Sequence, residues 1–153
     1  MTMPKGWQNE QIVSKKENFN KEKEQISSKN EQTNSIITVD DKIVIQELIT
    51  KYNLAIDNKN TDEWTNTWTD DGIWTTTFGE AKGKTELNNM INQITNEFAS
   101  GKRHLSTNII IEGAPNNMAS AKSYLIVTEA KKTPEVVASG TYSDILKKNN
   151  TGA

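Results

Sequence analysis

The chain has 153 residues, which suits a single domain, and only 33% of them are hydrophobic, so part of the chain is expected to lie outside the core. Its net charge of -2 argues against nucleic acid as a partner, and the absence of cysteine excludes disulfides, thiolate nucleophiles and zinc-thiolate sites. There is no membrane-length apolar run and no secretory signal pattern. We therefore expect a soluble cytoplasmic protein with no nucleic-acid or membrane partner and no metal site.

Residues 1–36 are dominated by Lys, Glu, Gln, Asn and Ser, with few apolar residues to bury. Ile12, Phe19 and Ile26 fall at seven-residue spacing, which is a thin apolar seam for a helix. We predict a flexible, solvated tail, with a loosely docked helix or a partner-binding arm as alternatives.

The domain proper is predicted over residues 37–153, and it opens with helices. Thr38 or Asp40 can cap a helix that reaches Asn58. Apolar residues recur along it at helical spacing, at Ile45, Leu48, Ile49, Tyr52, Ala55 and Ile56. Thr61 can cap a shorter helix with Trp64 and Trp68 on one face, ending at residues 70–72.

Strand signals follow. Residues 73–78 predict a strand, and a third helix is predicted from its cap at Thr85 to Phe98. The pattern then predicts three long strands joined by short turns, at 105–112, 118–129 and 136–147. Helices followed by a strand meander indicate an α+β fold, with a curved antiparallel sheet covered on one face by the helices.

Residues 149–152, Asn-Asn-Thr-Gly, have the composition of a hairpin turn that leads out of the third long strand. Only Ala153 follows them, so a returning strand is absent from this position. The sheet edge is then left open, covered by a partner or by the N-terminal segment, or the sequence is part of a longer protein. An open edge beside apolar strands promotes aggregation.

His104 is the one histidine of the chain, and it lies at the start of a strand. Histidine is the usual general base near neutral pH, although a lone strand histidine is often only structural. Strand alternation puts His104, Ser106, Asn108 and Ile110 on one face and Leu105, Thr107, Ile109 and Ile111 on the other. We expect Ser106 and Asn108 to line a pocket with His104, and Leu105, Ile109 and Ile111 to form an outer face that binds a second copy or lies under a helix.

Four segments together resemble the SnoaL-like branch of the nuclear transport factor 2-like superfamily, in its dehydratase and dehydrochlorinase part. They are DDKIVIQELITKYNLAIDNKNTDEWTNTWTDDGIW (40–74), the Gly83-Lys84 pair with its following helix, RHLSTNIIIEG (103–113) and ASGTYSDIL (138–146). The resemblance implies a cone-shaped α+β barrel with a deep pocket. The superfamily includes dehydratases, isomerases, polyketide cyclases and non-catalytic binding proteins, so the fold does not select an activity.

The resemblance also implies a site. Its dehydratases use an aspartate near the end of the first helix to orient a strand histidine, and Asp57 and His104 occupy those positions. Tyr52 matches a tyrosine that some members place five residues before the aspartate, although such a pair lies on different sides of a straight helix. Members also continue into a last strand with a Trp and a basic residue, which is missing here.

These observations predict a cofactor-independent lyase or isomerase that removes a proton from a small hydrophobic cyclic molecule. His104 would be the base, Asp57 its orienting partner and Tyr52 a hydrogen-bond donor. Trp64, Trp68, Trp74 and Phe78 would form an aromatic wall, or else simply belong to the core. Arg103 could hold an anionic group or form a surface ion pair. The alternative is a non-catalytic ligand-binding or oligomer-forming domain, and a dimer or trimer through the sheet is expected in either case.

Overall fold

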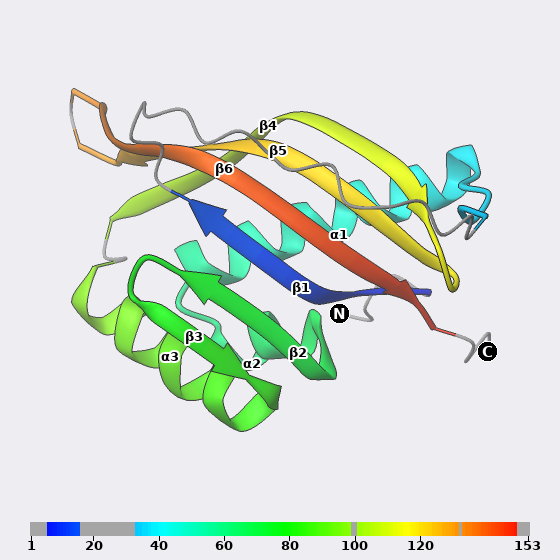
Figure 1. Ribbon diagram of the computed structural model, residues 1–153. Coiled ribbons are helices and arrows are strands. Elements are labelled where there is room, and N and C mark those ends of the chain that lie inside the picture. The colour runs from blue at the N-terminus through cyan, green and yellow to red at the C-terminus, as the bar shows by residue number, and fades with distance from the viewer. Residues whose placement is uncertain (1–5, 16–32, 99–100, 132, 150–153) are drawn as a thin grey trace, which may run out of the picture.

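The computed structural model describes residues 6–15, 33–98, 101–131 and 133–149, which form three helices and six strands (Figure 1). The helices are α1 (Val39–Asp57), α2 (Thr61–Asn66) and α3 (Gly83–Glu97). The strands are β1 (Trp7–Lys15), β2 (Trp68–Thr76), β3 (Gly79–Lys82), β4 (Lys102–Ala114), β5 (Met118–Glu129) and β6 (Glu135–Lys148). The predicted α+β class is confirmed.

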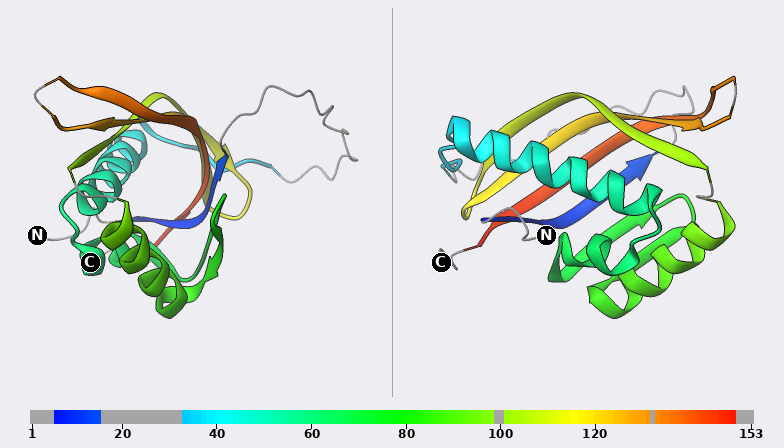
Figure 2. Two further views of the ribbon diagram at one scale, coloured as in Figure 1. Left: turned by 90° about the vertical axis from the view of Figure 1, so that its left-hand side faces the viewer. Right: turned by 180° about the vertical axis from the view of Figure 1, so that it is seen from behind.

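The strands form one sheet in the order β3-β2-β1-β6-β5-β4. All neighbours pair antiparallel except β1 and β2, which are parallel, so the sheet is mixed and not wholly antiparallel as predicted. Seen end-on, the sheet curves around α1 and α3, which lie on its concave side (Figure 2). The curvature leaves room for a pocket between helices and sheet.

Helix α1 begins where the sequence predicts, at Thr38. The Thr38 side chain accepts a hydrogen bond from the Asp41 backbone N–H (3.1 Å), and the Asp41 carboxylate accepts one from the Thr38 backbone N–H (3.1 Å). This capping box satisfies two backbone donors that the first turn would leave unpaired. The inner face of α1 then contributes Ile45 and Leu48 to one hydrophobic cluster and Tyr52 and Ile56 to another.

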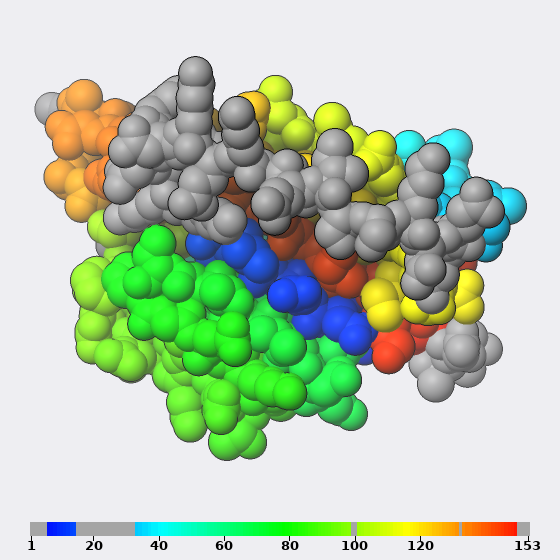
Figure 3. Space-filling model, in the orientation of Figure 1, coloured from blue at the N-terminus to red at the C-terminus, as the bar shows by residue number. Residues whose placement is uncertain are grey.

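The N-terminal segment corrects the prediction of a solvated tail. Residues 7–15 form β1, which lies between β2 and β6 and pairs with both, as the blue band of Figure 3 shows. Trp7 and Ile12 are 2% and 3% exposed, so these two apolar residues of the segment are core residues. Phe19 and Ile26, the other two residues of the predicted apolar seam, lie outside the described residues.

The two ends of the described chain meet, as in a hairpin. The Asn149 backbone N–H donates to the Gly6 carbonyl (2.7 Å), and the Asn149 amide donates to the Gln8 side chain (3.0 Å). Strand β1 therefore occupies the place where a strand returning from β6 would lie. Of the possibilities that the sequence left open for this edge, coverage by the N-terminal segment is the one that the structure shows.

The second helix is shorter than predicted. Helix α2 is capped by Asn60 instead of Thr61 and ends at Asn66, and Trp68 begins strand β2. Trp68 is drawn into the sheet because β1 pairs beside it, with Asn9 opposite Trp68. Trp64 and Trp68 still pack together, with ring centroids 5.3 Å apart.

The third helix and the turns also differ in detail from the prediction. Helix α3 begins at Gly83 instead of Thr85, and its first turn is closed by Glu86, whose carboxylate accepts from the Lys82 backbone N–H (2.8 Å). The glycine-marked turn region contains the short strand β3, which forms a hairpin with β2. This hairpin carries Phe78 at its turn.

Candidate active site

Asp57 and His104 meet where the end of α1 packs on β4. The His104 Nδ1 lies 2.7 Å from the Asp57 Oδ1, and the His104 backbone N–H donates to both carboxylate oxygens at 3.1 and 3.2 Å. The Asp57 side chain is 6% exposed and the His104 side chain is 15% exposed. Because a carboxylate accepts hydrogen bonds, the Nδ1–H donates to Asp57, and in the neutral form of the imidazole Nε2 carries the free lone pair.

A second contact reinforces this arrangement. Asn53, one helical turn before Asp57, donates from its side-chain amide to the Ser106 hydroxyl (2.8 Å), two residues after His104. Four residues of helix rise about 6 Å and two residues of strand about 6.6 Å, so the two pairs match in spacing. The paired contacts fix the helix end on the strand and restrict the orientation of the imidazole.

His104 forms part of the wall of a pocket of about 330 Å³. The other lining side chains are mainly apolar and come from the helices, the β2–β3 hairpin and the long strands, and they include Ile56, Trp74, Phe78, Ile91, Phe98, Leu125, Val137 and Tyr142. Phe78 and Phe98 are 64% and 49% exposed and stack at 5.6 Å, so they mark the side where the pocket opens to solvent. A base in such a wall acts in a water-poor environment.

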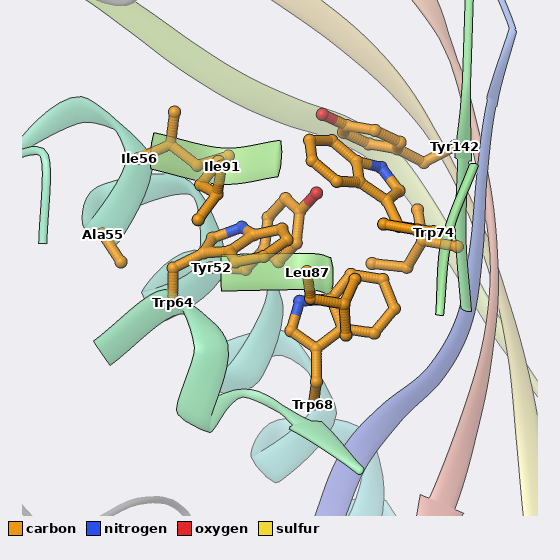
Figure 4. Packing of buried hydrophobic residues seen from close by; sticks show 11 residues of the cluster. Tyr52, Ala55, Ile56, Trp64, Trp68, Trp74, Leu87, Ile91 and Tyr142 are labelled. Atoms are coloured by element: carbon orange, nitrogen blue, oxygen red, sulfur yellow. The ribbon is translucent and has the colours of Figure 1, made fainter. Parts of the chain in front are cut away.

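The predicted aromatic wall divides into two parts. Trp74 and Phe78 line the pocket, whereas Trp64 and Trp68 are fully buried beneath it. Tyr52 lies with these two indoles, at centroid distances of 5.3 and 6.2 Å, and is not among the lining residues (Figure 4). Arg103 is exposed and outside the lining.

The expected alternation along β4 is wrong beyond Thr107, because a bulge interrupts the pairing with β5 between Thr107 and Ile110. Asn108 has a positive φ of 54° at this bulge and is exposed, so it does not line the pocket. The extra residue turns Ile109 and Ile111 inward, where they join the core. Ser106 does point inward, to Asn53, but outside the pocket lining.

The outer face of the sheet is therefore composed differently from the prediction. It exposes Leu105, Ile110 and Tyr124, at 44%, 63% and 56%, respectively. Ile109 and Ile111 face the core instead, because of the bulge in β4. Of the three apolar residues predicted for the outer face, Leu105 keeps its place.

Two further functional candidates lie on β6, and the sequence alone did not place them in the site. Tyr142 is 6% exposed and lines the pocket, and Asp144, two residues further on the same inner face, is 5% exposed with one carboxylate oxygen that lacks a hydrogen-bond partner. Burial raises the pKa of the Asp144 carboxyl to about 7. The sequence does contain a pattern that could have located them: Tyr142, Asp144 and Leu146 alternate with a period of two, so all three lie on one face of the strand. A carboxyl on such an otherwise apolar face is unusual.

The described part of the chain contains no group of three His, Asp or Glu side chains that could hold a metal ion. Within the same residues, no helix is long and apolar enough to cross a membrane.

Residues 38–152 match the family model described as the SnoaL-like domain. The chain belongs to the SnoaL-like family. A search of curated proteins finds no match. Strand β1 lies before the matched region, so this SnoaL-like domain takes one strand of its sheet from outside the matched residues.

Solved structures agree on the fold of this SnoaL-like domain. A Nostoc punctiforme protein of unknown function with a cystatin-like fold is 32% identical, with a TM-score of 0.69, over 74% of this chain and 84% of that one. ActVI-ORFA from Streptomyces coelicolor is 18% identical, with a TM-score of 0.65, over 71% and 86% of the two chains. An NTF2-like protein with a cystatin-like fold from Novosphingobium aromaticivorans is also 18% identical, with a TM-score of 0.61, over 75% and 85%. The two more distant likenesses support the fold alone.

Proposed function

We propose that this protein is a cofactor-independent lyase or isomerase that removes a proton from a small, hydrophobic, cyclic molecule. The observation that carries the proposal is the 2.7 Å contact of Asp57 with His104 in the wall of an apolar pocket. The pocket volume of about 330 Å³ suits a substrate of one or two fused rings.

The proposed reaction begins when His104 Nε2 takes a proton from a substrate carbon. The electron pair of the broken C–H bond forms a new double bond, and either a leaving group departs with its own pair or the charge moves onto a conjugated oxygen. Asp57 holds the Nδ1 proton, which keeps Nε2 available as the base and stabilises the imidazolium that forms. Positioned proton transfer of this kind contributes about 10²- to 10⁴-fold in rate.

A direct test uses 5-nitrobenzisoxazole, a flat bicyclic compound that opens to a coloured phenolate when a base removes its ring proton. Wild-type protein should accelerate the opening, and His104→Ala should lower kcat/KM by about 10²-fold or more. Asp57→Asn should lower it by a similar order, because the amide favours the wrong tautomer. Arg103→Ala is the matched control, since Arg103 is adjacent in sequence but exposed outside the pocket.

The proposal fails if wild type and His104→Ala open the probe equally fast. Circular dichroism and urea unfolding of each variant check that the fold is retained. This check matters for Asp57, because its carboxylate also accepts the His104 backbone N–H and so helps to hold α1 on β4.

The hydrogen bond from the His104 backbone N–H to the Asp57 carboxylate favours a second candidate function, a non-catalytic ligand-binding domain. In that case the Asp57–His104 pair only holds α1 on β4. The expected result is then equal binding of the unreactive analogue nitrobenzene by wild type and His104→Ala, with no turnover of the probe by either. Calorimetry with both proteins distinguishes this outcome from catalysis.

We also propose that copies of the chain associate through the outer face of the sheet, where Leu105, Ile110 and Tyr124 are exposed. Ile110→Lys should then lower the molar mass measured by light scattering to that of a monomer. Ile43→Lys, on the exposed side of α1, is the control and should leave the mass unchanged. An Ile110→Lys protein of unchanged mass would contradict the proposal.

A further inference from the structure

We propose that Tyr142 is a second catalytic residue, whose hydroxyl donates a hydrogen bond to the substrate oxygen that gains negative charge while His104 removes the proton. This inference rests on the proposed function above. It gives Tyr142 on β6 the role of hydrogen-bond donor that the sequence predicted for Tyr52 on α1.

The position of Tyr142 supports this role. It points from the sheet toward the helices, with its ring edge-on to that of Tyr52 at a centroid distance of 6.1 Å, and it lines the same pocket as His104 (Figure 4). Through β5, His104 aligns with Ala138 on β6, four residues from Tyr142. Four residues along the strand and two strand spacings across it put the two Cα atoms about 16 Å apart. Because the sheet is concave on this side, both side chains face the one pocket that they line, from different strands (Figure 2).

The surroundings of Tyr142 keep its hydroxyl protonated. Burial raises the pKa of the Tyr142 phenol and the negative charge of Asp144 raises it further, whereas interaction with the Tyr52 hydroxyl partly opposes this rise and Asp57 adds to it slightly. A neutral phenol in a pocket with little water is a hydrogen-bond donor to an oxyanion.

The other tyrosines of the chain do not meet these conditions. Tyr52 is buried among indoles and does not line the pocket, and Tyr124 is 56% exposed on the opposite face of the sheet. They serve as comparisons: loss of the Tyr52 hydroxyl changes the packing behind Tyr142, whose ring lies edge-on to that of Tyr52, and loss of the Tyr124 hydroxyl changes only the surface.

The ring opening of a benzisoxazole illustrates which bonds form and break in the proposed step. His104 Nε2 gains the ring proton, the C–H pair completes a nitrile, and the N–O bond breaks with its pair on oxygen. The resulting phenolate accepts the hydrogen bond of Tyr142, which keeps its own proton. The phenolate then leaves, and His104 returns its proton to water.

The test compares two probes, 5-nitrobenzisoxazole and unsubstituted benzisoxazole, whose phenolate is the more basic of the two. Tyr142→Phe should lower kcat about tenfold for the nitro compound and by a clearly larger factor for the unsubstituted one, with little change in KM. Tyr52→Phe should lower both rates by one common factor, and Tyr124→Phe should change neither.

A binding measurement separates the hydrogen bond from the shape of the pocket. Tyr142→Phe should weaken 4-nitrophenolate at pH 9 about tenfold and leave nitrobenzene binding unchanged, which also shows that the variant is folded. Equal loss for both probes, or undiminished phenolate binding, overturns the role of Tyr142. If instead His104→Ala retains wild-type turnover, the proposed function fails, and the binding result still decides the role of Tyr142 as a donor.

Discussion

Replacing Asp144 by asparagine should remove a destabilising charge that the wild-type protein carries at and above neutral pH. Asp144 lies opposite Ile12 of β1 and Ala121 of β5, and Tyr52 of α1 and Tyr142 of β6 are the titratable groups that feel its charge. Neither is a cation. Burial without a compensating positive partner therefore raises the pKa of Asp144 from 3.8 to about 7.

The sign of the effect follows from proton binding. Between pH 4 and 7 the folded protein keeps a proton on Asp144 that the unfolded chain has lost, so the free energy of unfolding falls as pH rises through this window. A shift of about three units at about 1.4 kcal/mol each corresponds to roughly 4 kcal/mol, fully lost above pH 7. Asp41 does not interfere: burial opposes its ionisation, but hydrogen bonds from Lys148, Trp7 and Thr38 hold its pKa well below the ordinary value.

The assay is urea unfolding of wild type and Asp144→Asn at fixed ionic strength from pH 4.5 to 8.5. The difference in unfolding free energy between the two proteins should change by several kcal/mol in favour of the variant across this range, and then level off. The slope should not exceed about 1.4 kcal/mol per pH unit, the limit for one proton. Two parallel curves would refute the assignment of a buried, protonated Asp144.

Four further predictions concern the sheet. Trp7→Phe should lower the unfolding free energy by about 2–3 kcal/mol in urea titrations, because it removes the indole N–H that donates to Asp41 (3.0 Å). An unchanged urea midpoint would contradict the importance of that hydrogen bond. A permuted chain that starts at residue 33 and continues from residue 153 into residues 1–15 should keep the wild-type circular dichroism spectrum, because Asn149 and Gly6 are hydrogen-bonded neighbours. Deletion of residues 1–15 should abolish cooperative unfolding, and a stable deletion variant would count against the role of β1. Asn108→Gly should preserve or slightly raise stability, whereas Asn108→Val should cost about 1–2 kcal/mol, since a β-branched residue resists the positive φ of 54°; equal stability of the two variants would argue against the bulge.

Much of the helical and strand structure was predictable because its signals are local. The apolar spacing from Ile45 to Ile56 and the cap at Thr38 predict α1, and the period-two runs predict the three long strands. The Asp57–His104 pair became predictable through the family resemblance and not through spacing alone. Their 2.7 Å contact agrees with that expected geometry, while their role in a reaction stays a prediction.

The place of β1 was decided by tertiary structure. By itself, the sequence of residues 7–15 has too few apolar residues to predict a strand, but a gap between β2 and β6 offers unpaired backbone on both sides. Pairing on two edges and burial of Trp7 compensate for the weak local signal. The same pairing pulls Trp68 out of the expected helix and into β2.

The α+β class, the long elements and the residue types available for chemistry all follow from local sequence patterns. Which of those residues face the pocket depends on how the strands pair: Trp74, Phe78 and Tyr142 line it, and Asn108 does not. The reason is physical. Facing in a strand follows from its register with neighbours that are distant in sequence, and one bulged residue reverses it for every residue that follows.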